Sequence, residues 1–135
     1  MTPRVGRDWF SLELSAGWKA EQHTECVTLT TSPDGGSFQL SAARKEASPI
    51  NRAEVREMAS HDATLMGKAF PVAMSSFKGL SVRYQHEGAF WRRFWLAQGH
   101  LLVFATYNGP PESSVAEEPA VEAMLGTLRP ENGAA

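Results

Sequence analysis

The sequence is short of the residues that hold metals, disulfides or lipid bilayers. Cys26 is its one cysteine, which excludes an intramolecular disulfide and a multi-cysteine zinc site. No stretch approaches the roughly 18 apolar residues of a membrane-spanning helix. Arg4, Arg7 and Asp8 interrupt the N-terminal segment where a signal peptide would be apolar. We therefore expect a cytoplasmic protein without a metal or a cofactor.

The composition is that of one globular domain. The chain has 135 residues, of which 42% are hydrophobic and 21% charged. A chain of this length buries enough surface to form a core without metals or disulfides. We expect a single domain over residues 1–135, with its core at about 9–129 and a frayed tail at 130–135.

The net charge is small, but the charges are unevenly distributed. Thirteen basic and fifteen acidic residues give −2, which argues against a nucleic-acid or membrane partner. Residues 68–109 hold five basic residues and one acid, a balance of +4, whereas residues 110–135 hold one basic residue and five acids, a balance of −4. This segregation predicts that the acidic last segment folds over the basic middle one.

The first third of the chain has the period-two pattern of β-strands. Apolar and polar residues alternate over 10–14 and again over 38–42, and 26–31 is rich in β-branched residues. The turn-forming segment 32–36 joins the last two stretches as a hairpin. We predict three strands here.

Residues 52–66 have the pattern of a helix. Asn51 is a candidate N-cap and Glu54 its capping-box partner. Apolar residues then recur at helical spacing, at Val55, Met58, Ala59, Leu65 and Met66. Gly67 is a candidate C-terminal stop.

Residues 72–107 are typical of a four-stranded meander, because Gly79, Gly88 and Gly99 separate strand-like stretches. The predicted strands are 72–77, 80–86, 89–97 and 100–107. A last helix is expected to have Pro119 in its first turn and to bury Val121, Met124, Leu125 and Leu128. The order βββ-α-ββββ-α predicts an α+β fold, an antiparallel sheet of about six to seven strands flanked by two helices.

Turns at Glu87-Gly88 and Gln98-Gly99 would determine which side chains share a face of the meander. They place Trp91 opposite Tyr84, and Trp95 opposite Leu80 and Leu102. We expect this face to be the main core, with Trp91, Trp95, Tyr84, Val82, Leu80, Leu102 and Phe104.

The opposite face mixes apolar residues with arginines, and two interpretations stay open. Either a helix covers it and the arginine side chains reach out past that helix, or part of it is an open groove for a partner peptide or helix. In the second case the partner-binding residues are Arg83, Phe90, Arg92, Phe94 and Tyr107. The same pairing puts Arg83 opposite Arg92, a like-charge pair that needs a shared carboxylate, from 117–122 or from a partner.

The sequence offers no set of catalytic residues. The four histidines are scattered without an HExxH motif, and no GxSxG motif or glycine-rich phosphate loop is present. Cys26 lies in a predicted strand, where a lone cysteine is usually a small buried apolar residue. We assign no catalytic and no metal-binding residue.

The chain resembles the PsbP-like structural group, which includes bacterial DcrB-like proteins, a eukaryotic Ran-binding import factor and the Eag-type chaperones of secretion effectors. The resemblance spans about residues 9–129 and rests on four segments: 10–14 with Gly17-Trp18, the hairpin 32–40, the strand 99–108, and the end of the last helix at 124–129. It implies an antiparallel sheet flanked by helices that binds other proteins, with no shared active site. Unlike exported members, the chain shows no signal peptide or lipidation cysteine, and its central helix segment is shorter than in Eag-type chaperones.

These observations favour a non-catalytic protein-binding module, such as a small bacterial cytosolic adaptor, secretion-effector chaperone or immunity protein. One alternative is a small-molecule binder or enzyme with a pocket between sheet and helices, near Trp18, Trp91 and His86. A second alternative is a structural subunit that hides one sheet face in a homodimer.

Overall fold

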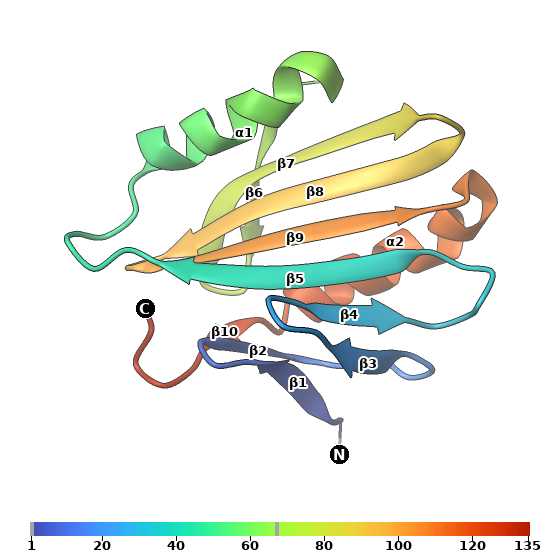
Figure 1. Cartoon of the computed structure of the whole chain (residues 1–135), viewed down its shortest axis with the longest axis horizontal. Helices are drawn as coiled ribbons and strands as arrows, with labels where there is room; N and C mark the ends of the chain where they lie inside the picture. The colour runs from blue at the N-terminus through green and yellow to red at the C-terminus, as the bar shows by residue number, and fades with distance from the viewer. Residues whose placement is uncertain (1, 67) are drawn as a thin grey trace.

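The computed structural model describes residues 2–66 and 68–135, and the side chains of all of these except 62–66. Five strands precede the first helix (Figure 1): β1 Arg4–Arg7, β2 Phe10–Glu13, β3 Lys19–Gln22, β4 Val27–Thr30 and β5 Ser37–Arg44. Helix α1 (Arg52–Met66) follows, and then the strands β6 Phe70–Met74, β7 Phe77–His86, β8 Ala89–Gln98 and β9 Leu101–Gly109. Helix α2 (Pro111–Leu125) and the short strand β10 (Arg129–Pro130) end the fold.

The strands form two antiparallel sheets. The larger has seven strands in the order β3-β4-β5-β9-β8-β7-β6, and the smaller has three in the order β1-β2-β10. The α+β class and the sheet flanked by two helices are as predicted. The sequence pattern missed β1, β3 and β10. All four residues of β3 are exposed, so this strand lacks the alternation that reveals a half-buried strand.

The hairpin turns decide which residues share a face, and the first is as predicted. Glu87 and Gly88 both have positive φ, and Trp91 lies opposite Tyr84. The second turn differs, because Gln98 pairs with Leu101 and leaves Gly99-His100 as the turn. Trp95 therefore lies opposite Phe104, not Leu102. The shift is two residues, so every side chain keeps its predicted face.

The expectation that Gly79 ends a strand is wrong. Gly79 pairs with Val72 inside the β6–β7 hairpin and with Leu96 on its other side. A Cβ at Gly79 would lie 1.7 Å from the backbone oxygen of Trp95, so a glycine is required by the close approach of the neighbouring strand.

Helix α1 begins and ends at the predicted residues. The capping box forms, because the Glu54 amide donates to Asn51 Oδ1 and the Asn51 amide donates to Glu54 Oε1. Val55 and Ala59 are buried against Val82 and Trp95 of the sheet. The predictions for the side chains of Leu65 and Met66 and for Gly67 lie outside the described residues.

Helix α2 begins eight residues earlier than predicted. Pro111, not Pro119, occupies its first turn, and Pro119 lies inside the helix. The longer helix brings Glu117 and Glu118 from the expected N-terminus to the middle, where Glu117 is buried. None of the helices in the described part of the chain is long and apolar enough to cross a bilayer.

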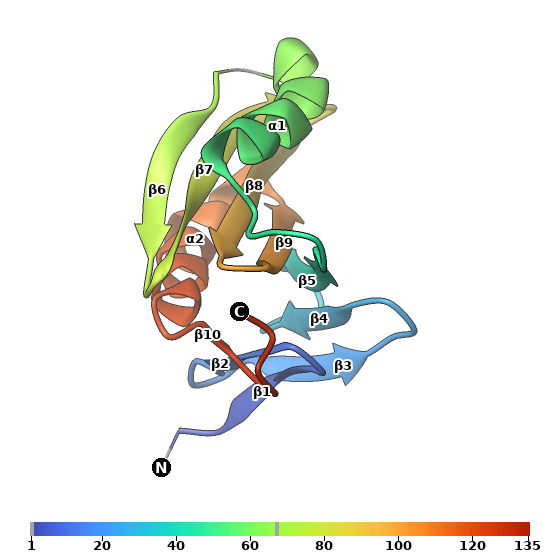
Figure 2. The ribbon, with the colours of Figure 1, turned by 90° about the vertical axis from the view of Figure 1, so that its left-hand side faces the viewer.

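The two faces of the large sheet are covered unequally (Figure 2). Helix α2 and the small sheet contribute to a large apolar cluster with β5, β8 and β9, which includes Phe10, Leu12, Phe38, Phe94, Leu96 and Leu125. Helix α1 covers the other face over β7 and β8 with a much smaller cluster. The expectation that the Trp91 and Trp95 face is the main core is therefore wrong, since the main core lies on the α2 side.

The C-terminal segment does not fray as expected. Arg129 and Pro130 pair with β2, and the Glu131 amide donates to the Trp9 carbonyl. Arg44 Nε donates to the carbonyl of Ala134, which is buried in the main core.

Candidate functional site

The five residues predicted to bind a partner lie on the sheet face that α2 covers. Phe94 and Tyr107 are fully buried, and Phe90 is 8% exposed. Arg92 is 3% exposed, so its side chain does not extend past the helix into solvent, although the covering-helix alternative expected it to do so. Arg83 is the one of the five with a largely accessible side chain. Of the two alternatives for this face, the covering helix is the one found, because α2 begins early, at Pro111, and is long enough to lie over it.

One carboxylate of α2 resolves the like-charge pair in the sheet. Arg83 lies directly opposite Arg92, as predicted. Glu118 accepts two hydrogen bonds from Arg83, at 2.8 and 2.7 Å, and one from Arg92 at 2.9 Å. Burial alone would raise the pKa of Glu118, but these hydrogen bonds outweigh it and lower the pKa below its usual value. The acidic last segment thus folds over the basic middle one, and the required acid comes from the protein itself.

Arg92 is held by several further contacts. Its Nε donates to Ser81 Oγ at 2.8 Å, and its Nη1 also donates to Glu122 at 3.1 Å. The guanidinium lies 4.5 Å from the ring centre of Phe94 and 5.4 Å from that of Phe70. These contacts explain how a charged group is accommodated in the interior.

A second carboxylate of α2 ties the helix to the β4–β5 loop. Glu117 Oε1 accepts from the Tyr107 hydroxyl at 2.6 Å and from the Gly36 amide at 2.7 Å. Burial, followed by the hydrogen bond to Glu117, raises the pKa of Tyr107. Tyr107 is thus an internal anchor for α2 and not a contact for a partner.

The face that α2 does not cover is only partly covered by α1. Seven strands at roughly 4.8 Å spacing make a sheet about 29 Å wide, whereas a helix is about 10 Å across. Helix α1 packs mainly on β7 and β8, and it leaves β9, β5 and β4 without a helix. We call this uncovered region the open face and define it by Thr28, Gln39, Ser41, Ala43, Trp91, Arg93, Leu102, Phe104, Thr106 and Asn108.

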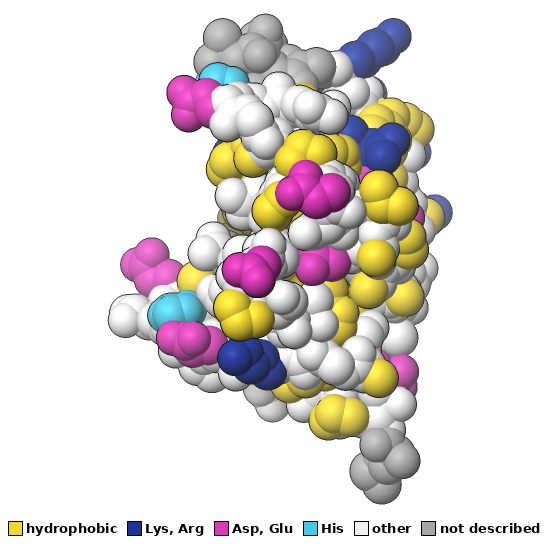
Figure 3. Space-filling model, turned by 90° about the vertical axis from the view of Figure 1, so that its right-hand side faces the viewer, with side chains coloured by type: hydrophobic (Ala, Val, Ile, Leu, Met, Phe, Trp, Pro, Cys, Tyr) yellow, Lys and Arg dark blue, Asp and Glu magenta, His cyan; other side chains and the backbone are white. Residues whose placement is uncertain are grey.

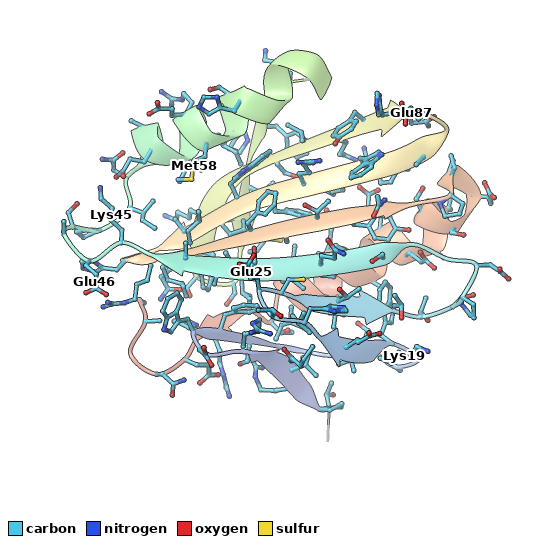
Figure 4. All side chains as sticks on the ribbon, in the orientation of Figure 1. Lys19, Glu25, Lys45, Glu46, Met58 and Glu87 are labelled. Atoms are coloured by element: carbon cyan, nitrogen blue, oxygen red, sulfur yellow. The ribbon has the colours of Figure 1, made fainter. Side chains whose placement is uncertain are left out.

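The open face is concave. The sheet curls so that α1 stands at one rim and β3 with β4 at the other (Figure 2). The space-filling view from the end of the strands shows a notch in the outline between these rims (Figure 3). In Figure 4, Met58 points from α1 toward the sheet, the charged side chains of Lys19, Lys45, Glu46 and Glu87 lie around the margin of this face, and Glu25 lies in front of β5.

Aromatic and cationic side chains are stacked at one end of the open face. The rings of Tyr84 and Trp91 are parallel within 5°, with centres 6.0 Å apart. The Arg93 guanidinium lies 5.3 Å from the Trp91 ring centre, and its Nε donates to the Tyr84 hydroxyl at 3.0 Å. All three residues are half-buried. The stack is thus pre-formed, with part of its surface accessible to solvent.

Two polar atoms on the open face lack the hydrogen bonds that buried groups normally make. Among the buried side-chain atoms of the described residues, Trp91 Nε1 and Thr28 Oγ1 have no partner. Both residues belong to the same concave surface. A buried polar group left unpaired costs free energy.

The cavities of the structure do not match the predicted ligand pocket. One of about 410 Å³ lies at the β1–β2 turn and is lined by residues that include Arg7, Trp9 and Glu25. Another of about 310 Å³ lies between β6–β8 and α2. Trp18 belongs to the main core on the α2 side, whereas Trp91 lies on the opposite face of the sheet. They do not line a common pocket, and no three His, Cys, Asp or Glu side chains in the described part of the chain gather as metal ligands would.

Comparison with known proteins identifies the fold. No family model and no curated protein matches the chain. A crystal structure from Bacteroides thetaiotaomicron superposes with a TM-score of 0.69 at 17% identity, over 94% of this chain and 47% of that one. The chain thus spans about half the length of that protein. A Pseudomonas aeruginosa protein of unknown function, PA94, described as a candidate regulator, superposes with a TM-score of 0.57 at 18% identity, over 90% of this chain and 91% of that one. These similarities show a shared fold.

Proposed function

We propose that this α+β protein is a non-catalytic protein-binding module and that the open face binds a segment of another protein. The observation that carries the proposal is the half-buried aromatic stack on a concave sheet face. Aromatic side chains that are partly exposed and held rigidly are typical anchors of protein interfaces.

The dimensions of the open face suit a helix or an extended peptide. Three strands at roughly 4.8 Å spacing are about 10 Å wide, and the eight residues of β5 extend over about 26 Å. Such a surface matches one or two elements of secondary structure laid across a sheet. Charged side chains at the margin, including Lys19 and Glu87, would form the polar rim of the interface.

An adaptor, secretion-effector chaperone or immunity protein acting in the cytoplasm fits this proposal. The resemblance to the PsbP-like group supports it by analogy, since that group uses a sheet flanked by helices to bind proteins. The relevant surface, however, is the face opposite to the one that sequence reasoning favoured.

Site-specific photo-crosslinking tests the proposal. A photoreactive phenylalanine analogue replaces Phe104 on the open face, and in a matched control it replaces Val115, which is 79% exposed on α2. In cells of the source organism we expect the Phe104 position, but not the Val115 position, to crosslink a second protein. That adduct should disappear when Thr106→Glu adds a charge to the open face and persist with Val115→Glu.

Two outcomes would contradict the proposal. An absence of any adduct at Phe104 in a folded protein would remove the open face as a binding surface. An adduct between two copies of this chain, with a dimeric mass in solution, would instead support the homodimer alternative.

A further inference from the structure

A second candidate site lies on the other side of the sheet. The cavity of about 310 Å³ between β6–β8 and α2 is lined by Phe70, Arg83, Arg92, Glu118 and Glu122. It faces away from the open face, so a ligand here is independent of the proposed protein partner.

The buried guanidinium of Arg92 keeps one nitrogen for this cavity. Its Nε and Nη1 are engaged by Ser81, Glu118 and Glu122. Its Nη2 makes no hydrogen bond within the described residues, although the side chain is only 4% exposed. An unpartnered Nη2 would be fully buried only if no solvent touched it, and it is not one of the fully buried atoms of the described residues that lack a partner. Solvent therefore reaches Nη2 through the cavity. The Nη2 nitrogen, which carries two N–H donors, is thus accessible from the cavity.

Glu122 is the weaker of the two carboxylate partners of Arg92. Its side chain is 47% exposed, and it makes a single contact with Nη1 at 3.1 Å. A carboxylate placed in the plane of the guanidinium at the Nη1–Nη2 edge would accept two parallel hydrogen bonds instead of one. Such a ligand would displace Glu122 into solvent and leave Glu118 on both arginines.

The wall beside this edge is apolar. Phe70 is half-buried, and its ring centre lies 5.4 Å from the Arg92 guanidinium. The volume is at the lower end of the range of small-molecule sites. We propose that this cavity binds a small carboxylate with a flat apolar body, the carboxylate on the Nη1–Nη2 edge of Arg92 and the apolar part against Phe70.

Benzoate is a suitable probe, with benzamide as its uncharged analogue. Binding is followed by NMR from the Arg92 Nε–Hε signal, whose donor is held by Ser81. We expect benzoate to shift this signal in a saturable manner and benzamide to bind at least about tenfold more weakly, because its contact lacks the charge. Glu122→Gln should tighten benzoate binding by about fivefold, the upper end of what a half-exposed ion pair contributes.

A matched control separates this site from general electrostatics. Glu112→Gln removes the same charge from the exposed first turn of α2 and should leave benzoate binding unchanged. Arg92→Lys keeps the charge but removes the planar fork, and it should abolish binding in a protein shown to be folded by its thermal unfolding. If that variant does not fold, the comparison of Glu122→Gln with Glu112→Gln still decides. No saturable shift, equal binding of benzamide, or equal effects of the two glutamines would overturn the proposal.

Discussion

Replacing Glu118 by glutamine removes the one charge that lets Arg83 and Arg92 lie opposite each other in the sheet. The glutamine keeps the size of the side chain and one hydrogen-bond acceptor. Arg92 would then retain Glu122 as its only carboxylate partner within the described residues, through a single contact of 3.1 Å. The variant therefore measures the electrostatic contribution of Glu118 with little change in packing.

The expected cost lies between the values for exposed and buried ion pairs. Exposed pairs contribute about 0–1 kcal/mol, and removing one partner of a fully buried pair costs about 3–5 kcal/mol. The side chains of Arg92 and Glu118 are 4% and 14% exposed, whereas that of Arg83 is 53% exposed. We expect Glu118→Gln to lower the free energy of unfolding by about 2 kcal/mol, which is about 7 °C in Tm for a chain of this length.

The effect of a second substitution, Arg83→Met, on the free energy of unfolding should depend on whether Glu118 is present. In the native protein, Arg83→Met loses a half-exposed ion pair and should cost about 0.5–1 kcal/mol. In the Glu118→Gln background the same change removes a cation that repels Arg92, so it should be neutral or stabilising. Urea unfolding of the four proteins gives the coupling energy, which we expect to be about 0.5 kcal/mol or more. An Arg83→Met cost that is the same in both backgrounds would refute the idea that Glu118 neutralises a like-charge pair.

Two further predictions follow from the same structure. Because the pKa of Glu118 is lower in the folded than in the unfolded protein, its stabilising contribution is complete above the ordinary carboxyl pKa of about 4.3 and is lost as the pH falls through the folded value. The urea concentration at the unfolding midpoint, measured from pH 7 to pH 3, should fall once the pH is below about 4.5. It should fall less steeply in Glu118→Gln, and parallel profiles for the two proteins would contradict this. Gly79→Ala should cost about 3 kcal/mol or more, because its Cβ would meet the Trp95 carbonyl at 1.7 Å. Gly88→Ala, with φ of +79° but open space around it, should cost about 1 kcal/mol; equal losses of Tm would show that the β7–β8 contact is not tight.

The features predicted correctly from the sequence are those determined by residues close together in the chain. The capping box at Asn51 and the turn at Glu87-Gly88 are determined by residues three or fewer positions apart, and both form as predicted. The pairing of Arg83 with Arg92, and the need for an acid between them, followed from that turn by counting.

The covering of each face could not be predicted in the same way. Alternation shows which residues share a face, but it does not show which helix lies over that face. The prediction placed Pro119 in the first turn of α2, so it did not decide whether a helix or a partner covers the Arg92 face. Pro111 was the better signal, because a proline that follows another proline at the end of a strand suits the first turn of a helix. The candidate site consequently lies on the face that was expected to be the core.

The alternation of β8 also has a consequence for how such a chain changes over evolutionary time. Phe90, Arg92, Phe94 and Leu96 are constrained by the interior, whereas Trp91 and Arg93, between them, lie on an accessible surface. A related chain that acquires a different recognition target can therefore substitute positions 91 and 93 without disturbing the scaffold, whereas Trp95 is buried under α1. An alignment of such relatives should show variable columns at positions 91 and 93 between conserved columns at 90, 92 and 94.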